Sequence, residues 1–344
     1  MKRIFIYCLL CGIVFSAKAQ DKPKLVVGIV VDQMRYDYLY AFAKRYTANG
    51  FKRLLKEGFV FHNAHFNYVP TYTGPGHASI YAGSTPSSHG IIANDWPDKT
   101  TGKNIYCTSD STVSTVGTTT LAGKQSPHYL LSTNIADELR LATNKQSKVV
   151  GIALKDRSSI MPAGHMPTGA YWFDDSIGNW ITSSYYTKEL PAWVKTYNDK
   201  KTAEKYLSQN WNTLFSIETY TNAWGDTNRY EKVFAGEKSS AFPHPLAQIR
   251  KENHGSFNTI KFTPFGCTIT TELAMEAIKA EELGKDEITD LLCISYSSPD
   301  YVGHYYGIRS IEMEDIYLRL DRELEMLFQF LDKQVGKGQY TVFL

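Results

Sequence analysis

Cysteine is scarce in this sequence. Five of the 344 residues are cysteines, and two of them, Cys8 and Cys11, lie in an apolar stretch near the N-terminus. The other three have no Cys-x-x-Cys spacing, which argues against a thiolate metal site. In an oxidising compartment they would allow one disulfide and one free thiol, and the sequence leaves the pairing open. These three residues are Cys107, Cys267 and Cys293.

Long apolar runs are also missing, apart from one at the start of the chain. Residues 4–15 are almost entirely apolar, follow a basic start and precede small residues at Ala17 and Ala19. This pattern predicts a secretory signal peptide over residues 1–19, cleaved after Ala19 rather than retained as an anchor. The run is shorter than the roughly 20 residues that a membrane span needs. We therefore expect a periplasmic or secreted protein with no stable membrane span after cleavage.

The sequence has no large excess of charge of either sign. The whole chain carries a formal charge of +2, and loss of Lys2, Arg3 and Lys18 with the signal peptide takes it to −1. A nearly neutral chain gives no electrostatic reason to expect nucleic acid as a partner. The 43% of hydrophobic residues is enough for a globular core. The sequence does not indicate an oligomeric state.

Apolar, β-branched runs alternate with amphipathic segments between residues 24 and 344. The run from Lys24 to Val31 is typical of a strand that is buried on both faces. Alternating strands and helices predict an α/β fold with a mostly parallel central sheet and helices on both of its faces. Further strands are expected at 59–61, 148–154, 291–296 and 340–344, and helices at 36–57, 77–83, 134–142, 271–283 and 310–331.

Residues from about 165 to 260 interrupt this alternation. They are rich in Tyr, Trp, Asn, Ser and Thr and contain few long apolar runs. We expect an inserted cap region beside the core, within one catalytic domain that covers residues 24–344. The last residues, Tyr340 to Leu344, give a strand signal with no turn or cap after it. We therefore expect the domain to be incomplete at its C-terminus.

Charged side chains follow three of the predicted strands. Asp32 follows the first strand, Lys155 and Arg157 follow a second, and Asp300 and His304 follow a third. Because ligands of parallel sheets bind beyond the C-terminal strand ends, these side chains are candidates for one site. A carboxylate and an imidazole are suitable zinc ligands, although an isolated Asp-x-x-x-His pair is often structural. Asp32 alone could equally cap a helix, and the two cations could be solvated loop residues.

The sharpest local pattern is the segment from Thr71 to Ser79. Thr73 stands just before a glycine-rich turn that opens a helix, where free N–H groups and the helix dipole favour an anion. Its hydroxyl could cap the helix, or it could attack phosphorus if a metal activated it. We interpret His77 as a packing or capping residue rather than a ligand. Asn94 could donate its amide to a phosphoryl oxygen or simply occupy a turn.

Five of these motifs occur together, in an order that resembles the alkaline phosphatase superfamily. Within it, the chain is similar to the PafA-type periplasmic alkaline phosphatases. The resemblance runs from about residue 24 to residue 344 and rests on segments 30–35, 70–77, 89–94, 155–158 and 298–304. It implies an alkaline-phosphatase-like sandwich fold and the hydrolysis of small-molecule phosphate monoesters.

The resemblance also implies a metal centre. Asp32 and the Thr73 hydroxyl would ligate one zinc ion, and Asp300 and His304 would ligate a second. Thr73 would form a covalent phosphoenzyme that a zinc-bound hydroxide then hydrolyses. The family completes this centre with further ligands, which are expected beyond Leu344. We therefore expect this segment, made alone, to be inactive and poorly folded.

By the same resemblance, Asn94, Lys155 and Arg157 would hold the non-bridging phosphoryl oxygens. A monoester dianion has three such oxygens, so the two cations favour a phosphomonoesterase. The alternatives are a phosphodiesterase or nucleotide pyrophosphatase on the same scaffold, and a non-catalytic protein that keeps the fold. Nothing in the sequence identifies the natural monoester.

Overall fold

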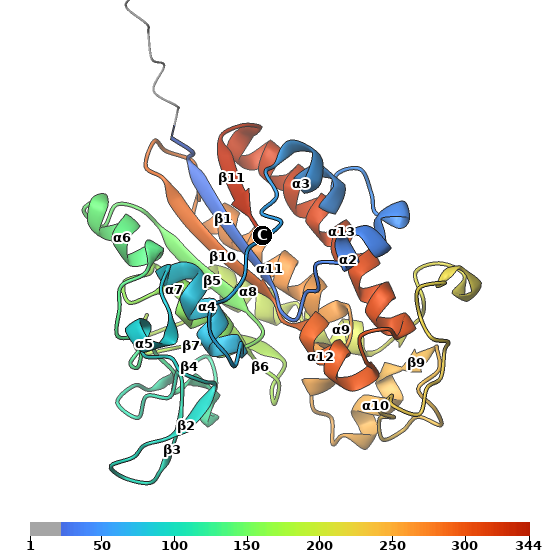
Figure 1. Cartoon of the computed structure of the whole chain (residues 1–344). Coiled ribbons are helices and arrows are strands. Elements are labelled where there is room, and N and C mark those ends of the chain that lie inside the picture. The colour runs from blue at the N-terminus through green and yellow to red at the C-terminus, as the bar shows by residue number, and fades with distance from the viewer. Residues whose placement is uncertain (1–21) are drawn as a thin grey trace, which may run out of the picture.

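A seven-stranded sheet forms the centre of the protein (Figure 1). The computed structural model describes residues 22–344, so the predicted signal peptide lies outside the described residues. The strand order is β11-β1-β10-β5-β6-β7-β4, and the first four neighbouring pairs are parallel. This order confirms the mostly parallel sheet. The strands are β1 (Leu25–Val31), β4 (Thr115–Val116), β5 (Val149–Ala153), β6 (Gly169–Asp174), β7 (Asn179–Ser183), β10 (Asp290–Tyr296) and β11 (Tyr340–Phe343).

Alternate residues of these strands enter two separate cores. On one face, Val27 of β1 and Ile294 of β10 join the main hydrophobic cluster. On the other face, Cys293 and Val149 pack against Tyr81 in a smaller cluster. The central strands are therefore buried on both faces, as their continuous apolar sequences predict.

Helices cover both faces of the sheet. Helices α4 and α7 pack against each other, and α7 contacts β5, β6 and β10, whereas α11 and α13 pack together on the opposite face (Figure 1). This arrangement confirms the expected α/β architecture. The helices are α2 (Tyr38–Ala41), α3 (Phe51–Glu57), α4 (Thr73–Ala82), α5 (Pro86–His89), α6 (Ile135–Ala142), α7 (Asp156–Ala163), α8 (Ala192–Asp199), α9 (Thr202–Leu207), α10 (Leu246–Glu252), α11 (Phe265–Ala280), α12 (Ser298–Tyr306) and α13 (Ile311–Leu331).

The segment expected as an insert, about 165–260, divides into two parts. Its first part forms β6 and β7, which extend the central sheet. Its second part holds α8, α9, α10 and a small hairpin of β8 (Asn210–Trp211) and β9 (His244–Pro245). The indole N–H of Trp211 donates to Asp315 at 2.8 Å and so ties this second part to α13.

Two local expectations are wrong. The segment expected as one long helix is broken into α2 and α3, because Asp321 of α13 accepts hydrogen bonds from the backbone N–H groups of Thr47 and Phe51 at 2.6 and 2.8 Å. The expected strand at the next aromatic stretch does not form. Phe59 and Phe61 instead lie in a loop, with 82% and 75% of their surface exposed.

Cys107, Cys267 and Cys293 are buried free thiols, so none of them is joined in a disulfide. Among residues 22–344, no helix combines the length and the apolar character that crossing a bilayer requires.

Candidate active site

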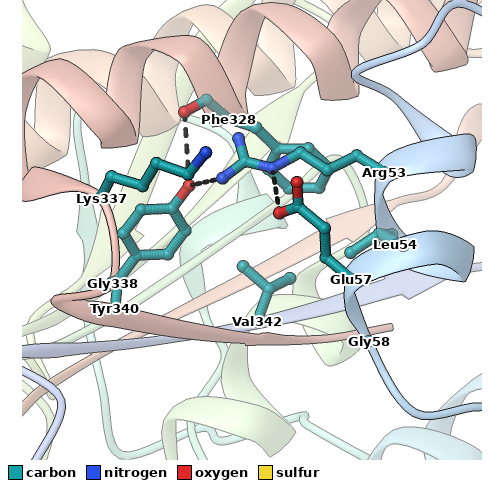
Figure 2. A pocket seen from close by; sticks show the side chains of 9 residues that line it. All are labelled: Arg53, Leu54, Glu57, Gly58, Phe328, Lys337, Gly338, Tyr340 and Val342. Carbon is teal, nitrogen blue, oxygen red and sulfur yellow. Dashed lines mark hydrogen bonds and ion pairs between the residues drawn. The ribbon is translucent and has the colours of Figure 1, made fainter.

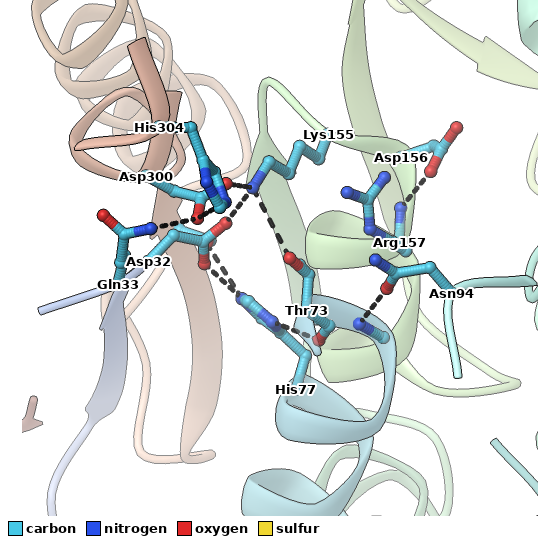
Figure 3. A network of polar contacts seen from close by, with 12 residues as sticks. Asp32, Gln33, Thr73, His77, Asn94, Lys155, Asp156, Arg157, Asp300 and His304 are labelled. Carbon is cyan, nitrogen blue, oxygen red and sulfur yellow. Dashed lines mark hydrogen bonds and ion pairs between the residues drawn. The ribbon is translucent and has the colours of Figure 1, made fainter. Parts of the chain in front are cut away.

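All seven residues singled out in the sequence line one cleft of ≈ 680 Å³. Figure 3 shows most of them in one polar network, drawn from the ends of strands and the starts of helices. Segments far apart in the chain meet here because parallel strands deliver their C-terminal ends to the same edge of the sheet. The seven residues are Asp32, Thr73, Asn94, Lys155, Arg157, Asp300 and His304.

Lys155 lies at the centre of this network. It follows β5 and is buried, and its ammonium nitrogen lies 2.7 Å from Asp32 Oδ2 and 2.6 Å from Asp300 Oδ2. Burial acts to lower the pKa of Lys155, but the two carboxylates outweigh it and the pKa is raised. The ring of Tyr301 lies 4.9 Å from the same nitrogen. Lys155 is therefore a fixed cation rather than a solvated loop residue.

Asp32 is buried at the end of β1. Burial acts to raise its pKa, but the Lys155 ammonium outweighs burial, and the pKa lies below the ordinary value. Two charges buried in contact stabilise each other, and removing either partner would leave the other uncompensated. Asp32 thus serves as an ionised carboxylate facing the cleft, not as a helix cap.

Thr73 is the first residue of α4 and its side chain does not cap the helix. Its Oγ1 lies 3.4 Å from Lys155 Nζ, so the hydroxyl faces the cation. Asn94 instead binds the first turn, because its Oδ1 accepts from the Gly74 N–H at 2.8 Å. That bond fixes which end of the amide is the oxygen and leaves the NH₂ group for the cleft. In Figure 3 the Asn94 side chain lies between Arg157 and the start of α4.

His77 joins α4 to the sheet, as a packing histidine would. Burial lowers its pKa, so the ring is neutral. Its Nδ1 lies 2.9 Å from the Thr73 carbonyl oxygen, which can only accept, so Nδ1 carries the proton. Nε2 then accepts from the Ser295 hydroxyl at 2.9 Å. Ser295 was missed in the sequence, although its place near the end of a predicted strand was a usable signal.

Arg157 enters the cleft from the first turn of α7. Its Nη1 donates to the phenol oxygen of Tyr106 at 2.8 Å, and its Nε is buried with no hydrogen-bond partner among the described residues. A partly buried guanidinium with unused donors is suited to binding an anion. Tyr106 was also missed, because it lies on a hairpin far along the chain and carries no local motif.

Asp300 and His304 lie on one face of α12. His304 Nε2 lies 3.2 Å from Asp300 Oδ1, and the side chain of Gln33 donates to the same oxygen at 3.4 Å. His304 is the exposed member of the set, with 70% of its side chain accessible. The pair occurs as the Asp-x-x-x-His spacing predicts, and it opens onto the cleft.

The site fits part of a metal centre. Asp32 and Asp300 already converge on one cation, the Lys155 ammonium, and carboxylate, imidazole and hydroxyl groups are donors that zinc accepts. Within residues 22–344, however, no three His, Cys, Asp or Glu side chains form a group that could hold a metal ion. The donor types are therefore those that the zinc prediction requires. The residues from 22 to 344 supply too few ligands to complete a zinc site.

A second cavity, of ≈ 290 Å³, lies near the edge strand β11 (Figure 2). Two cations, Arg53 and Lys337, line it, and Arg53 is already paired with Glu57, Asp332 and the phenol of Tyr340. Paired groups are not available to a ligand, and no nucleophile converges there. We therefore place the chemistry in the cleft around Thr73.

Comparisons with known proteins agree with the family resemblance that the sequence motifs indicate. The family described as type I phosphodiesterase / nucleotide pyrophosphatase matches residues 26–344. A protein of Myroides odoratus named calcium-transporting ATPase is 51% identical over 98% of this chain and 62% of its own length. Alkaline phosphatase PafA of Elizabethkingia meningoseptica is 52% identical over 96% of this chain and 60% of its own length.

The solved structure of wild-type alkaline phosphatase PafA has the same fold. It aligns with a TM-score of 0.91 at 52% identity, over 93% of this chain and 62% of that one. The match confirms the resemblance inferred from the five motifs and the alkaline-phosphatase-like α/β fold. The chain spans about three fifths of the length of the relatives it matches.

Proposed function

The chain belongs to the type I phosphodiesterase / nucleotide pyrophosphatase family and to the PafA-like part of the alkaline phosphatase superfamily, and on this premise we propose that the whole protein hydrolyses phosphate monoesters with Thr73 as nucleophile. The name of the Elizabethkingia relative supports a phosphatase. The predicted signal peptide would deliver the enzyme to the periplasm or the medium.

One observation carries the proposal: the Thr73 hydroxyl lies beside the Lys155 ammonium, in a cleft that further nitrogen donors line. Lys155 Nζ lies 3.4 Å from Thr73 Oγ1, and Asn94 and Arg157 line the same cleft. A monoester is a dianion whose charge lies on three non-bridging oxygens. Donors that are fixed before the reaction stabilise that charge in the transition state without reorganising.

The proposed reaction has two displacements at phosphorus. In the first, the Thr73 oxygen bonds to phosphorus, the bond from phosphorus to the ester oxygen breaks, and the alcohol leaves with the proton of the Thr73 hydroxyl. In the second, water attacks phosphorus, the bond to Thr73 breaks, one proton of the water returns to the Thr73 oxygen, and inorganic phosphate leaves. The sum is ester plus water to alcohol plus phosphate. Lys155, Arg157 and Asn94 hold the phosphoryl oxygens through both steps.

Metal binding belongs to the same proposal. Asp32, Asp300 and His304, with the Thr73 hydroxyl, would hold zinc, and other divalent ions suit similar donors. Bound zinc would stabilise negative charge on the attacking and leaving oxygens. The further ligands that a complete zinc site needs would lie in a region that corresponds to the part of the relatives not covered by this chain.

The test compares monoester and diester hydrolysis in the protein expressed from its complete gene and supplied with zinc. Arg157→Ala should lower kcat/KM for p-nitrophenyl phosphate by about 100-fold, the usual loss for one donor to transition-state charge. It should lower kcat/KM for bis(p-nitrophenyl) phosphate by less than about 10-fold, since a diester has one charge fewer. Arg250→Ala is the matched control, because Arg250 pairs with Glu204 on the surface.

Two results would contradict the proposal. Equal losses for both substrates would favour a phosphodiesterase, and an unchanged rate in Thr73→Ala would favour a non-catalytic protein. ATP serves as a third substrate, because the name of the Myroides relative includes ATP hydrolysis. A phosphomonoesterase releases inorganic phosphate from ATP, whereas a nucleotide pyrophosphatase releases pyrophosphate.

A further inference from the structure

A two-stranded hairpin outside the central sheet begins next to Asn94, which lines the cleft, and ends at Tyr106, which contacts Arg157 of the cleft. It consists of β2 (Asp95–Pro97) and β3 (Asn104–Tyr106), and its base is closed by a bond from the Cys107 N–H to the Asn94 carbonyl at 2.9 Å. Asn94 therefore precedes one strand while Tyr106 ends the other. The hairpin thus carries a residue already assigned to the phosphoryl group and a tyrosine that has no assignment.

The phenol of Tyr106 lies between the guanidinium of Arg157 and the carboxylate of Asp156. Its phenol oxygen accepts from Arg157 Nη1 at 2.8 Å and donates its own proton to Asp156 Oδ1. No ion pair joins the Arg157 side chain directly to a carboxylate among residues 22–344. The phenol therefore stands where a carboxylate would otherwise neutralise the guanidinium. Burial, and then Asp156, raise the pKa of Tyr106, so the phenol keeps its proton.

We infer that Tyr106 is a positioning residue for Arg157: it holds the guanidinium in the cleft and keeps it from pairing with Asp156. The inference rests on the proposed phosphomonoesterase function. The phenol occupies one guanidinium donor and leaves other N–H donors of the same group for the phosphoryl group. Without the hydroxyl, Asp156 loses a donor and Arg157 loses an acceptor, and the two charges attract each other directly.

The test is a coupling experiment in the protein expressed from its complete gene and supplied with zinc. Tyr106→Phe keeps the ring in its apolar surroundings and removes only the hydroxyl. Tyr129→Phe is the matched control, because Tyr129 packs in the same cluster and makes no hydrogen bond with Arg157 or Asp156. Each change is made alone and together with Arg157→Ala, and kcat/KM is measured for a monoester and a diester. Inhibition by inorganic phosphate is measured in parallel.

The expected loss in Tyr106→Phe is about 10-fold in monoester kcat/KM, as removal of a hydrogen bond to a charged group predicts. Phosphate should inhibit this variant less strongly, while diester hydrolysis and the Tyr129→Phe enzyme should change by less than about twofold. In the Arg157→Ala background, Tyr106→Phe should cause no further loss, because its effect acts through the arginine.

Four results would overturn the inference. A similar loss for both substrates would show that the hydroxyl only supports the fold. An undiminished loss in the Arg157→Ala background would show that Tyr106 acts independently of the arginine. If Arg157→Ala itself left monoester hydrolysis unchanged, the proposed role of Arg157 would fall together with the inference. A loss in Arg157→Ala with none in Tyr106→Phe would overturn the inference and leave the proposed function standing.

Discussion

A buried histidine in the second part of the insert should make the stability of this protein depend on pH. His244 Nδ1 lies 2.7 Å from Glu237 Oε1, and its Nε2 lies 3.2 Å from Glu312 Oε1. All three side chains are almost fully buried. Burial acts to lower the pKa of His244, but the two carboxylates outweigh it and raise the pKa to about 9. The imidazolium therefore joins the insert to the start of α13.

The sign and size of the effect follow from that pKa. The folded pKa of about 9 lies above the ordinary 6.5, so the folded state binds the proton more tightly than the unfolded chain. The stabilisation is complete below pH 6.5, declines as the pH rises, and is lost above pH 9. It amounts to roughly 3 kcal/mol. Glu231 and Asp226 also face this cluster and remain in any variant of His244.

The perturbation is His244→Gln, in the protein expressed from its complete gene. Urea unfolding is followed by tryptophan fluorescence between pH 6 and pH 10, and the ring of Trp211, 5.0 Å from the imidazole, reports on this region. The native protein should lose roughly 3 kcal/mol more than the variant between pH 6.5 and pH 9.5. At pH 6.5 the variant should be the less stable, because two buried carboxylates have lost their cation.

Parallel curves of stability against pH for the two proteins would refute this reasoning. An NMR titration gives an independent reading, since a His244 ring that loses its proton below pH 7 would remove the premise. Glu312→Gln is the companion variant: it leaves one carboxylate with the imidazolium and should reduce the pH dependence without abolishing it.

Three further results are expected. Thr73→Ser should still be labelled covalently by a radioactive monoester in an acid quench, whereas Thr73→Ala should give no labelled protein; labelled Thr73→Ala would disprove the phosphothreonine. Asp300→Ala should carry less zinc per chain by elemental mass spectrometry after dialysis, and equal zinc would remove Asp300 from the ligand set. Gly74→Ala places a Cβ 3.2 Å from Asn94 Oδ1, so it should loosen that hydrogen bond and lower monoester kcat/KM by about 10-fold, with thermal unfolding as the check on stability.

The sequence predicted the sheet and the cleft for one physical reason. A strand buried on both faces must be almost entirely apolar, so a polar residue at its end marks the boundary where the chain leaves the core. Asp32 and Lys155 both stand at such boundaries. Parallel pairing then brings these ends together, whatever lies between them along the chain.

The two wrong secondary-structure predictions and the missed tyrosine also have a physical reason. Where α3 begins is decided by Asp321, a residue of a distant helix, which no local pattern reveals. Phe59 and Phe61 have strand propensity, but a strand forms only where a partner strand lies beside it, and none does among residues 22–344. Tyr106 was missed on the same ground, since its partner Arg157 is reached only through the folded hairpin.

Charge balance gives a further reason to expect a divalent cation in the cleft. The carboxylates of Asp32 and Asp300 are offset by the ammonium of Lys155 and the guanidinium of Arg157. An incoming monoester adds two negative charges, and two of the three N–H donors of Lys155 are already bound to the carboxylates. One divalent cation between the carboxylates would restore neutrality and free the ammonium. Inorganic phosphate should therefore bind weakly to the metal-free protein and at least about 10-fold more tightly after zinc is added, as calorimetry would measure; equal affinities would mean that Lys155 and Arg157 suffice alone.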